Sequence, residues 1–242
     1  SDVCSSDLRD AAAIAHHYDV GNEFYRLVLG PSMTYSCAFW AEDDFTLEDA
    51  QAAKYEVICR KLGLKPGMRL LDVGCGPGSI TIGLAEHLAL GAVDALDIEQ
   101  RRLDQAVALA RENDVQNVQF HLGSAYQLPF PDNTFDVVFE HMVLMHLSEP
   151  TVALKEAYRV LKPGGIFGGR DADWGGWLWG THLHDEMVHH HAEFARHFLS
   201  RKGSNYLFGR HLAASVRAAG FEPVMPTASY EVRATVETRT EF

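Results

Sequence analysis

Short runs of apolar residues alternate along this chain with longer segments in which apolar residues recur every three or four positions. An apolar run bounded by turn residues is typical of a buried strand, and the longer period is typical of an amphipathic helix. The runs predict strands over Met68–Val73, Ala92–Leu96, Val118–Leu122, Val137–Phe139 and Ile166–Gly169. The periodic segments predict helices over Leu47–Leu62, Ile80–Leu88, Glu99–Glu112, Thr151–Leu161 and Arg210–Ala219. Strands that alternate with helices in this way predict a Rossmann-like, doubly wound α/β fold.

A glycine-rich turn follows the first predicted strand, where Leu70–Ser79 reads Leu-Leu-Asp-Val-Gly-Cys-Gly-Pro-Gly-Ser. Glycine has no side chain to block a ligand against the turn, and it tolerates a positive φ. The next helix would begin with Ser79 as its N-cap. This arrangement opens many nucleotide-binding α/β domains, although a tight turn without a ligand has the same pattern. The third glycine comes one position too early for the dinucleotide fingerprint G-x-G-x-x-G, which disfavours a nicotinamide-dependent oxidoreductase.

The same turn resembles motif I of class I S-adenosylmethionine (SAM) dependent methyltransferases. The resemblance is carried by Asp72, Gly74, Gly76 and Gly78, which are spaced Asp-x-Gly-x-Gly-x-Gly. It implies that these four residues belong to a SAM-binding site.

Other candidate cofactor residues follow the second and third predicted strands. Asp97 ends the second strand, where an acid can accept hydrogen bonds from both hydroxyls of a ribose, and we place Ile98 in the same site. Alternatively, Asp97 is an acid stabilised by the positive end of the following helix. Many methyltransferases have Asp-Ala after the third strand, with the Asp holding the adenine amino group. Ser124 and Ala125 stand there in this chain, so the resemblance implies an uncharged contact from a hydroxyl.

The segment before the core interleaves aromatic and polar residues over 16–25 and 33–40. It resembles the N-terminal segment of cyclopropane fatty acid synthases and mycolic acid methyltransferases. In that family a Tyr-Ser pair folds over bound SAM, and the resemblance assigns this role to Tyr35 and Ser36. The alternative is a helix pair that only packs on the core. We therefore divide the chain into a tail (1–9), an N-terminal helical lid (10–63) and a SAM-binding domain (64–242).

The core carries a second resemblance. Leu128–Asp136 and the Leu-x-Pro-Gly-Gly step at Leu161–Gly165 resemble the ubiquinone/menaquinone-type small-molecule methyltransferases. The first resemblance covers about 10–78 and the second about 68–236, which suggests a mosaic. Sheets of methyltransferases end in an antiparallel pair, so the resemblance implies a seven-stranded sheet closed by Phe221–Met225 and Ser229–Val236, with an antiparallel last strand.

Glu140 and His141 leave the fourth predicted strand at its carboxyl end, where open α/β sheets bind their ligands. They are the best-placed titratable groups for a general base on the substrate side. The ordinary alternative is a solvated glutamate and a histidine hydrogen-bonded to a loop. The residues after the fifth strand, 170–177, include acids and tryptophans that either form a pocket wall or pack in the core.

Composition narrows the choice of partners. The chain has 242 residues and a net charge of −12, which argues against a general binder of nucleic acid or anionic membranes. No apolar run has the roughly 20 residues that a membrane helix needs. The four cysteines have no paired spacing, which indicates reduced thiols and a cytoplasmic location. Residues 182–197 are rich in histidine, but adjacent histidines on a helix point in different directions, so we expect no metal site.

The sequence thus predicts a SAM-dependent methyltransferase that acts on a small molecule or a lipid. One alternative is methylene transfer to an unsaturated lipid, as in cyclopropane fatty acid synthases. Another is a non-catalytic module that binds SAM.

Overall fold

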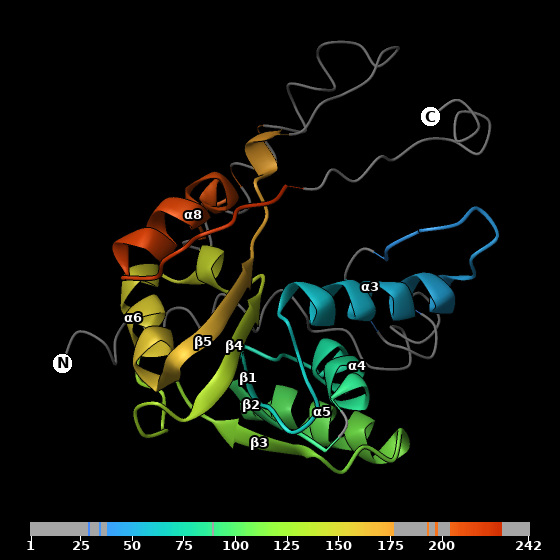
Figure 1. The fold of residues 1–242 in the computed structure, drawn as a ribbon. Coiled ribbons are helices and arrows are strands. Elements are labelled where there is room, and N and C mark those ends of the chain that lie inside the picture. Colours follow the sequence, from blue (N-terminus) through green and yellow to red (C-terminus); the bar gives the residue numbers. More distant parts are fainter. Residues whose placement is uncertain are drawn as a thin grey trace, which may run out of the picture.

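The computed structural model describes residues 38–88, 90–176 and 204–228, together with residues 29, 34, 193 and 197. Within these residues, five parallel strands form one sheet in the order β3-β2-β1-β4-β5 (Figure 1). The strands are β1 (Arg69–Val73), β2 (Ala92–Asp97), β3 (Val118–Leu122), β4 (Phe135–His141) and β5 (Leu161–Arg170). The helices are α3 (Leu47–Lys61), α4 (Ser79–His87), α5 (Gln100–Glu112), α6 (Pro150–Val160) and α8 (Phe208–Ala218). Short 3₁₀ helices, η1 (Leu144–His146) and η2 (Trp174–Gly176), follow β4 and β5.

Helices cover both faces of the sheet, with α3, α4 and α5 on one side and α6 and α8 on the other (Figure 1). Because successive residues of a strand point to opposite faces, β1 contributes Leu70 to the core on the α4 side and Leu71 to the core on the α6 side. Leu84 of α4 and Val160 of α6 complete these two cores, and all four side chains are fully buried. Burial on both faces explains why the central strand β1 contains the apolar pair Leu70 and Leu71.

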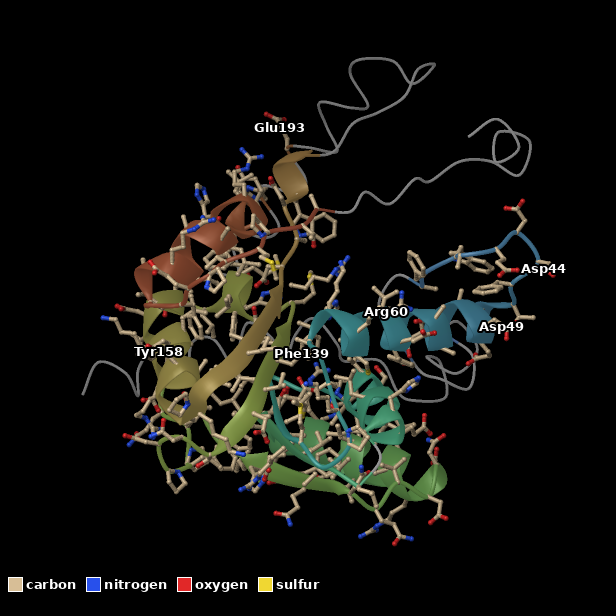
Figure 2. The ribbon with its side chains drawn as sticks, viewed as in Figure 1. Asp44, Asp49, Arg60, Phe139, Tyr158 and Glu193 are labelled. Carbon is tan, nitrogen blue, oxygen red and sulfur yellow. The ribbon has the colours of Figure 1, made fainter. Side chains whose placement is uncertain are left out.

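Helix α3 begins at a capping box. The Thr46 side chain accepts a hydrogen bond from the Asp49 N–H at 3.2 Å, and the Asp49 carboxylate accepts one from the Thr46 N–H at 3.0 Å. Asp49 and Arg60 mark the two ends of the helix in Figure 2, with the acid at the positive end of the helix dipole and the base at the negative end. The helix predicted over Leu47–Leu62 is therefore confirmed and ends one residue earlier.

The N-cap predicted for α4 is wrong, because Gly78 is the N-cap and Ser79 is already the first helical residue. Gly78 has a φ of 86°, in the left-handed region that favours glycine. A Cβ atom at this position would also lie 2.7 Å from the Cβ of Ala106 on α5. The close approach of α5 therefore selects glycine at the cap, where a serine side chain would clash.

The described part of the sheet is smaller than predicted and entirely parallel, so seven strands and an antiparallel last strand are not supported. Residues 221–225 form no strand. Phe221 instead packs its ring against Phe167 of β5 and Tyr158 of α6, and Pro223 has no N–H to donate to a strand ladder. Ser229–Val236 lies outside the described residues. The turn predicted at 162–165 is a bulge within β5, because the register jumps from Phe135–Leu161 to Val137–Ile166.

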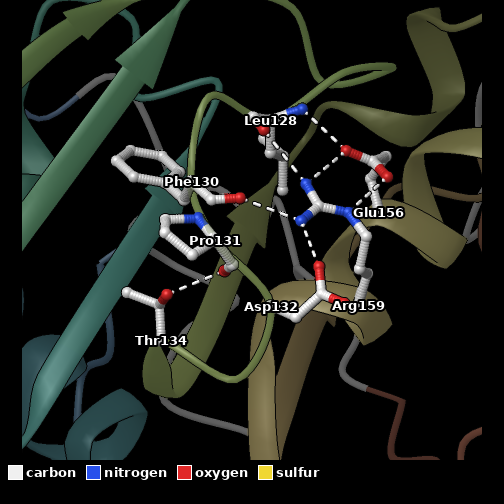
Figure 3. A network of polar contacts seen from close by, with 7 residues as sticks. All are labelled: Leu128, Phe130, Pro131, Asp132, Thr134, Glu156 and Arg159. Atoms are coloured by element: carbon white, nitrogen blue, oxygen red, sulfur yellow. Dashed lines mark hydrogen bonds and ion pairs between the residues drawn. The ribbon is translucent and has the colours of Figure 1, made fainter.

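Arg159 of α6 stabilises the turn that leads from β3 into β4 through hydrogen bonds and an ion pair (Figure 3). Its guanidinium donates to the carbonyl oxygens of Leu128 at 3.0 Å and Phe130 at 2.9 Å, and it forms an ion pair with Asp132 at 2.7 Å. Glu156 completes the network by bonding Arg159 and accepting the Leu128 N–H. The guanidinium thus satisfies carbonyl groups that a loop cannot pair with its own backbone.

Candidate functional site

The order of the strands reverses between β1 and β4. The chain moves outward from β1 to β2 and β3, and then returns to place β4 on the other side of β1. In open α/β sheets the ligand crevice lies at such a point, outside the carboxyl ends of the strands. Gly74 follows β1 at this edge, and β4 ends there with Glu140 and His141. The structure therefore brings the glycine turn and the predicted catalytic pair to the same edge.

The three glycines of the turn differ in what surrounds the position of a Cβ atom. Gly74, Gly76 and Gly78 all have positive φ angles, of 73°, 55° and 86°. A Cβ atom at Gly74 would lie 2.5 Å from Cγ2 of Val143, so this glycine admits a neighbouring side chain. A Cβ atom at Gly76 would meet no atom of the described residues within 4 Å. Gly76 is therefore the position at which the turn presents bare backbone to open space.

Asp97, the last residue of β2, is hydrogen-bonded to the glycine turn. Its Oδ2 accepts a hydrogen bond from the Gly76 N–H at 2.9 Å, and its Oδ1 accepts one from the Glu99 N–H at 3.0 Å. Burial raises the pKa of this carboxyl, and these two N–H groups oppose the shift. A carboxylate has about four acceptor sites, so two remain for ligand hydroxyls. The geometry fits the predicted ribose contact, and it shows that Asp97 also holds the turn.

Asp72 lies beneath the turn. Its side chain is buried, and its Oδ2 accepts a hydrogen bond from the Thr81 hydroxyl of α4 at 2.6 Å. Burial raises the pKa of Asp72 to about 6, and the charge of Asp97 adds to this shift. In this structure Asp72 joins β1 to α4, and any contact with a cofactor remains a prediction.

The remaining predicted cofactor residues line the carboxyl ends of β2 and β3. Ile98 is half-buried directly after Asp97. Ser124 lies in a small antiparallel bridge with Gln127, and its hydroxyl accepts the Tyr126 N–H at 3.0 Å. Ala125 packs at the border of two core clusters. The Ser124 hydroxyl therefore shapes its own loop, and its predicted adenine contact stays a prediction.

Glu140 is not the solvated acid that one interpretation of the sequence expects. Only 2% of the residue is exposed, and its Oε2 accepts the Leu144 N–H at 3.4 Å. Burial raises the pKa of Glu140 well above its usual range, and the neighbouring Asp171 raises it further. Burial and the neighbouring acid therefore favour the protonated form of this carboxyl.

His141 faces Arg170, its partner across the β4–β5 ladder. The Nη1 of Arg170 donates to Nε2 of His141 at 2.9 Å. A guanidinium can only donate, so the ring proton lies on Nδ1. Burial, and then the charges of Arg170 and Lys54, lower the pKa of His141 to about 3. The imidazole is therefore neutral at physiological pH.

Two features of the site escaped the sequence analysis. Asp171, directly after β5, stands beside Glu140; the sequence analysis placed it among the acids of a possible pocket wall but did not pair it with Glu140. Tyr55 of α3 donates from Oη to the Ser79 carbonyl at 3.3 Å and is hydrogen-bonded to the buried Thr34. Tyr35 and Ser36 lie outside the described residues, but their neighbour Thr34 is held close to the start of α4.

The described residues show neither a metal-binding cluster nor a membrane-spanning helix. In the described residues, no group of three or more histidine, cysteine or acidic side chains could hold a metal ion. Most of the histidine-rich segment lies outside those residues. In the same part of the chain, none of the helices combines the length and the apolar character needed to cross a membrane.

Comparison with known proteins identifies the family. Residues 5–168 match the family model of mycolic acid cyclopropane synthetase. The chain is 37% identical over 166 residues to a probable fatty acid methyltransferase of Pseudomonas putida, covering 67% of this chain and 42% of that protein. It is 55% identical over 81 residues to cyclopropane mycolic acid synthase 2 of Mycobacterium leprae, covering 34% of this chain and 26% of that protein. The crystal structure of mycolic acid cyclopropane synthase CmaA1, complexed with SAH and CTAB, matches with a TM-score of 0.64 and 26% identity, covering 87% of this chain and 74% of that one.

The chain spans less than half the length of these two curated relatives. The family match runs from the N-terminal segment through the glycine turn into β5. A single family therefore covers all of the first resemblance (about 10–78) and most of the second (about 68–236). It includes well over half of the chain. The protein therefore belongs to the mycolic acid cyclopropane synthetase family, within the class I SAM-dependent methyltransferases.

Proposed function

We propose that this protein binds SAM at the glycine turn and transfers its methyl group to a lipid or a small molecule. The observation that carries the proposal is Gly76, whose missing side chain faces open space beside the carboxylate of Asp97. A bare turn next to a ribose-binding acid is what an adenosyl cofactor requires. Family membership supports SAM as that cofactor.

SAM supplies an electrophilic methyl group on its sulfonium, and the residues of this chain would hold and orient it. Asp97 would accept hydrogen bonds from the ribose. Ile98 and Ala125 would contact the adenine with apolar surface, and the Ser124 hydroxyl would offer a hydrogen bond. Tyr35 and Ser36 would cover the methionine end. Rate enhancement would come mainly from alignment of donor and acceptor and from exclusion of water.

A lipid is the acceptor that the relatives favour, because several curated relatives are named for fatty acids and mycolic acids. The second candidate reaction is methylene transfer. There, the alkene would take the methyl carbon of SAM and release S-adenosylhomocysteine, and a base would accept the proton whose loss closes the cyclopropane ring. Relatives named as cyclopropane synthases favour this second reaction.

Calorimetric titration with SAM tests the proposed cofactor site. Asp97→Ala removes the carboxylate, and we expect at least a tenfold loss of affinity, about 1.4 kcal/mol. Asp104→Ala is the control, because Asp104 is an exposed acid on α5 that bonds only Gln100 among the contacts described. Equal affinities for the wild type and Asp97→Ala would contradict the assignment.

Product analysis separates the reactions. Incubation with SAM and an unsaturated phospholipid yields a methyl-branched or a cyclopropane acyl chain, which mass spectrometry and proton NMR distinguish. If the protein binds SAM but forms no S-adenosylhomocysteine with any of the acceptors tested, its function would be that of a non-catalytic SAM-binding module.

A further inference from the structure

A buried acid, Glu140, and a half-buried acid, Asp171, lie side by side at the carboxyl edge of the sheet. Glu140 is the penultimate residue of β4, and Asp171 directly follows β5, the neighbouring strand. Their side chains approach within hydrogen-bonding range of each other. Gly169 makes room for this pair, because a Cβ atom there would lie 2.6 Å from Oε1 of Glu140.

Each acid uses one oxygen to hold the turn after β4. Oε2 of Glu140 accepts the Leu144 N–H at 3.4 Å, and Oδ1 of Asp171 accepts the Met145 N–H at 3.2 Å. The other two oxygens, Glu140 Oε1 and Asp171 Oδ2, are buried and have no hydrogen-bond partner among the described residues. Unpaired buried acceptors are costly, and a single proton between these two oxygens would satisfy both.

The surrounding charges oppose full ionisation of the pair. Asp72 on β1 adds a third acid near Glu140, and Arg170 supplies the nearby positive charge that acts on Asp171. His141 is neutral and bonds Arg170. Burial raises the pKa of Asp171 to about 7, and it raises that of Glu140 well above its usual range. Two like charges this close in a buried site cannot both ionise at neutral pH.

The turn that the acids hold is in contact with the glycine turn. Val143, at the start of this turn, places its side chain against Gly74, where a Cβ atom would lie 2.5 Å from Cγ2 of Val143. Leu144 and Met145 are anchored in the core beside α6 and α8. A change at the two acids therefore reaches the cofactor turn through Val143.

We propose that Glu140 and Asp171 share one proton, and that this protonated pair positions the 143–145 turn against Gly74 so that the cofactor turn keeps its binding shape. In this proposal both acids are positioning residues, a different role for Glu140 from the general base of the sequence analysis. The inference rests on the proposed SAM site. When the shared proton is lost at high pH, two adjacent buried charges repel, the turn shifts, and the affinity for SAM falls.

The pH dependence of SAM binding tests the proposal. We expect the wild-type affinity to fall by about tenfold for each pH unit above the midpoint of the pair, in calorimetry between about pH 6 and about pH 9. In Glu140→Gln the amide donates to Asp171 in place of the shared proton, so the affinity should stay nearly level over this range. Glu86→Gln, an exposed acid on α4, should follow the wild type. Parallel pH profiles for the wild type and Glu140→Gln would overturn the proposal.

A second measurement needs no SAM, so it separates this inference from the proposed function. The ¹³C NMR signal of the Asp171 carboxyl should titrate near neutral pH in the wild type and at a clearly lower pH in Glu140→Gln, because the like-charged neighbour is gone. An identical titration in both proteins would show that no proton is shared. A wild type that fails to bind SAM at every pH, but shows this shift, would refute the proposed function and leave the shared proton standing.

Discussion

Replacement of Gly76 by alanine should abolish cofactor binding while leaving the fold largely intact. A left-handed φ costs an L-residue about 1–2 kcal/mol, and alanine recovers about 0.4–1 kcal/mol by restricting the unfolded chain. In the part of the chain that the structure describes, no atom lies within 4 Å of the added Cβ, so no clash there adds to this cost. The expected loss of unfolding free energy is therefore about 1 kcal/mol. The new methyl group would occupy the space that the ligand needs, and we expect at least a tenfold loss of SAM affinity.

Gly67 provides a matched control for this variant. It also has a positive φ, of 83°, and a Cβ atom there would likewise meet nothing within 4 Å. It lies before β1, at the opposite end of that strand from the site. Gly67→Ala should therefore lose about the same stability and keep wild-type affinity. Gly74→Ala should lose more stability, by a further 1–3 kcal/mol or so, because its Cβ collides with Val143.

Urea unfolding and calorimetric titration measure the two quantities on the same preparations. If Gly76→Ala bound SAM as tightly as Gly67→Ala, the space in front of Gly76 would not be the cofactor site, and the reasoning from the open Cβ position would fail.

Two further predictions concern stability. Burial raises the pKa of Asp72 from its ordinary 3.8 to about 6. Between these two values the folded chain holds a proton that the unfolded chain releases. The contribution of this proton to the free energy of unfolding is therefore complete below about pH 4 and is lost as the pH rises through about 6. Asp72→Asn should flatten this slope in urea unfolding at several pH values, and an unchanged slope would contradict it. Arg159→Met should cost about 1–3 kcal/mol and remove hydrogen-exchange protection from the turn at 128–134, because the carbonyls of Leu128 and Phe130 lose their donor. Arg60→Met, which removes only an exposed i,i+4 ion pair with Glu56, should cost no more than about 0.5 kcal/mol.

The elements of the core could be predicted because their signals are local. The apolar run before the glycines places β1 within one residue, and helical periodicity places α5 and α6 within one residue at each end. These patterns reflect burial on both faces of a parallel sheet, which is a property of each segment in itself.

The errors have tertiary causes. The Ser79 cap is wrong because Ala106 of α5 approaches the backbone at Gly78, a contact that local sequence does not show. The strand over Phe221–Met225 is wrong because Phe221 finds aromatic partners on β5 and α6. Glu140 is buried, and not solvated as the ordinary alternative expects, because β1 and β5 flank it in the sheet.

The glycine turn was predicted correctly as a place where side chains are excluded, but for a partly different reason. Val143 and Ala106 require glycine at Gly74 and Gly78, whereas a Cβ atom at Gly76 would meet none of the described residues. The glycine spacing alone therefore does not distinguish glycines that packing requires from a glycine that leaves space for a ligand.

The most direct measurement of the central claim is a calorimetric titration of the wild-type protein with S-adenosylhomocysteine, beside Gly76→Ala and Gly67→Ala. Saturable binding of one ligand per chain, lost in Gly76→Ala and kept in Gly67→Ala, is the predicted result. Absence of binding to the wild type, or equal binding by all three proteins, would contradict it.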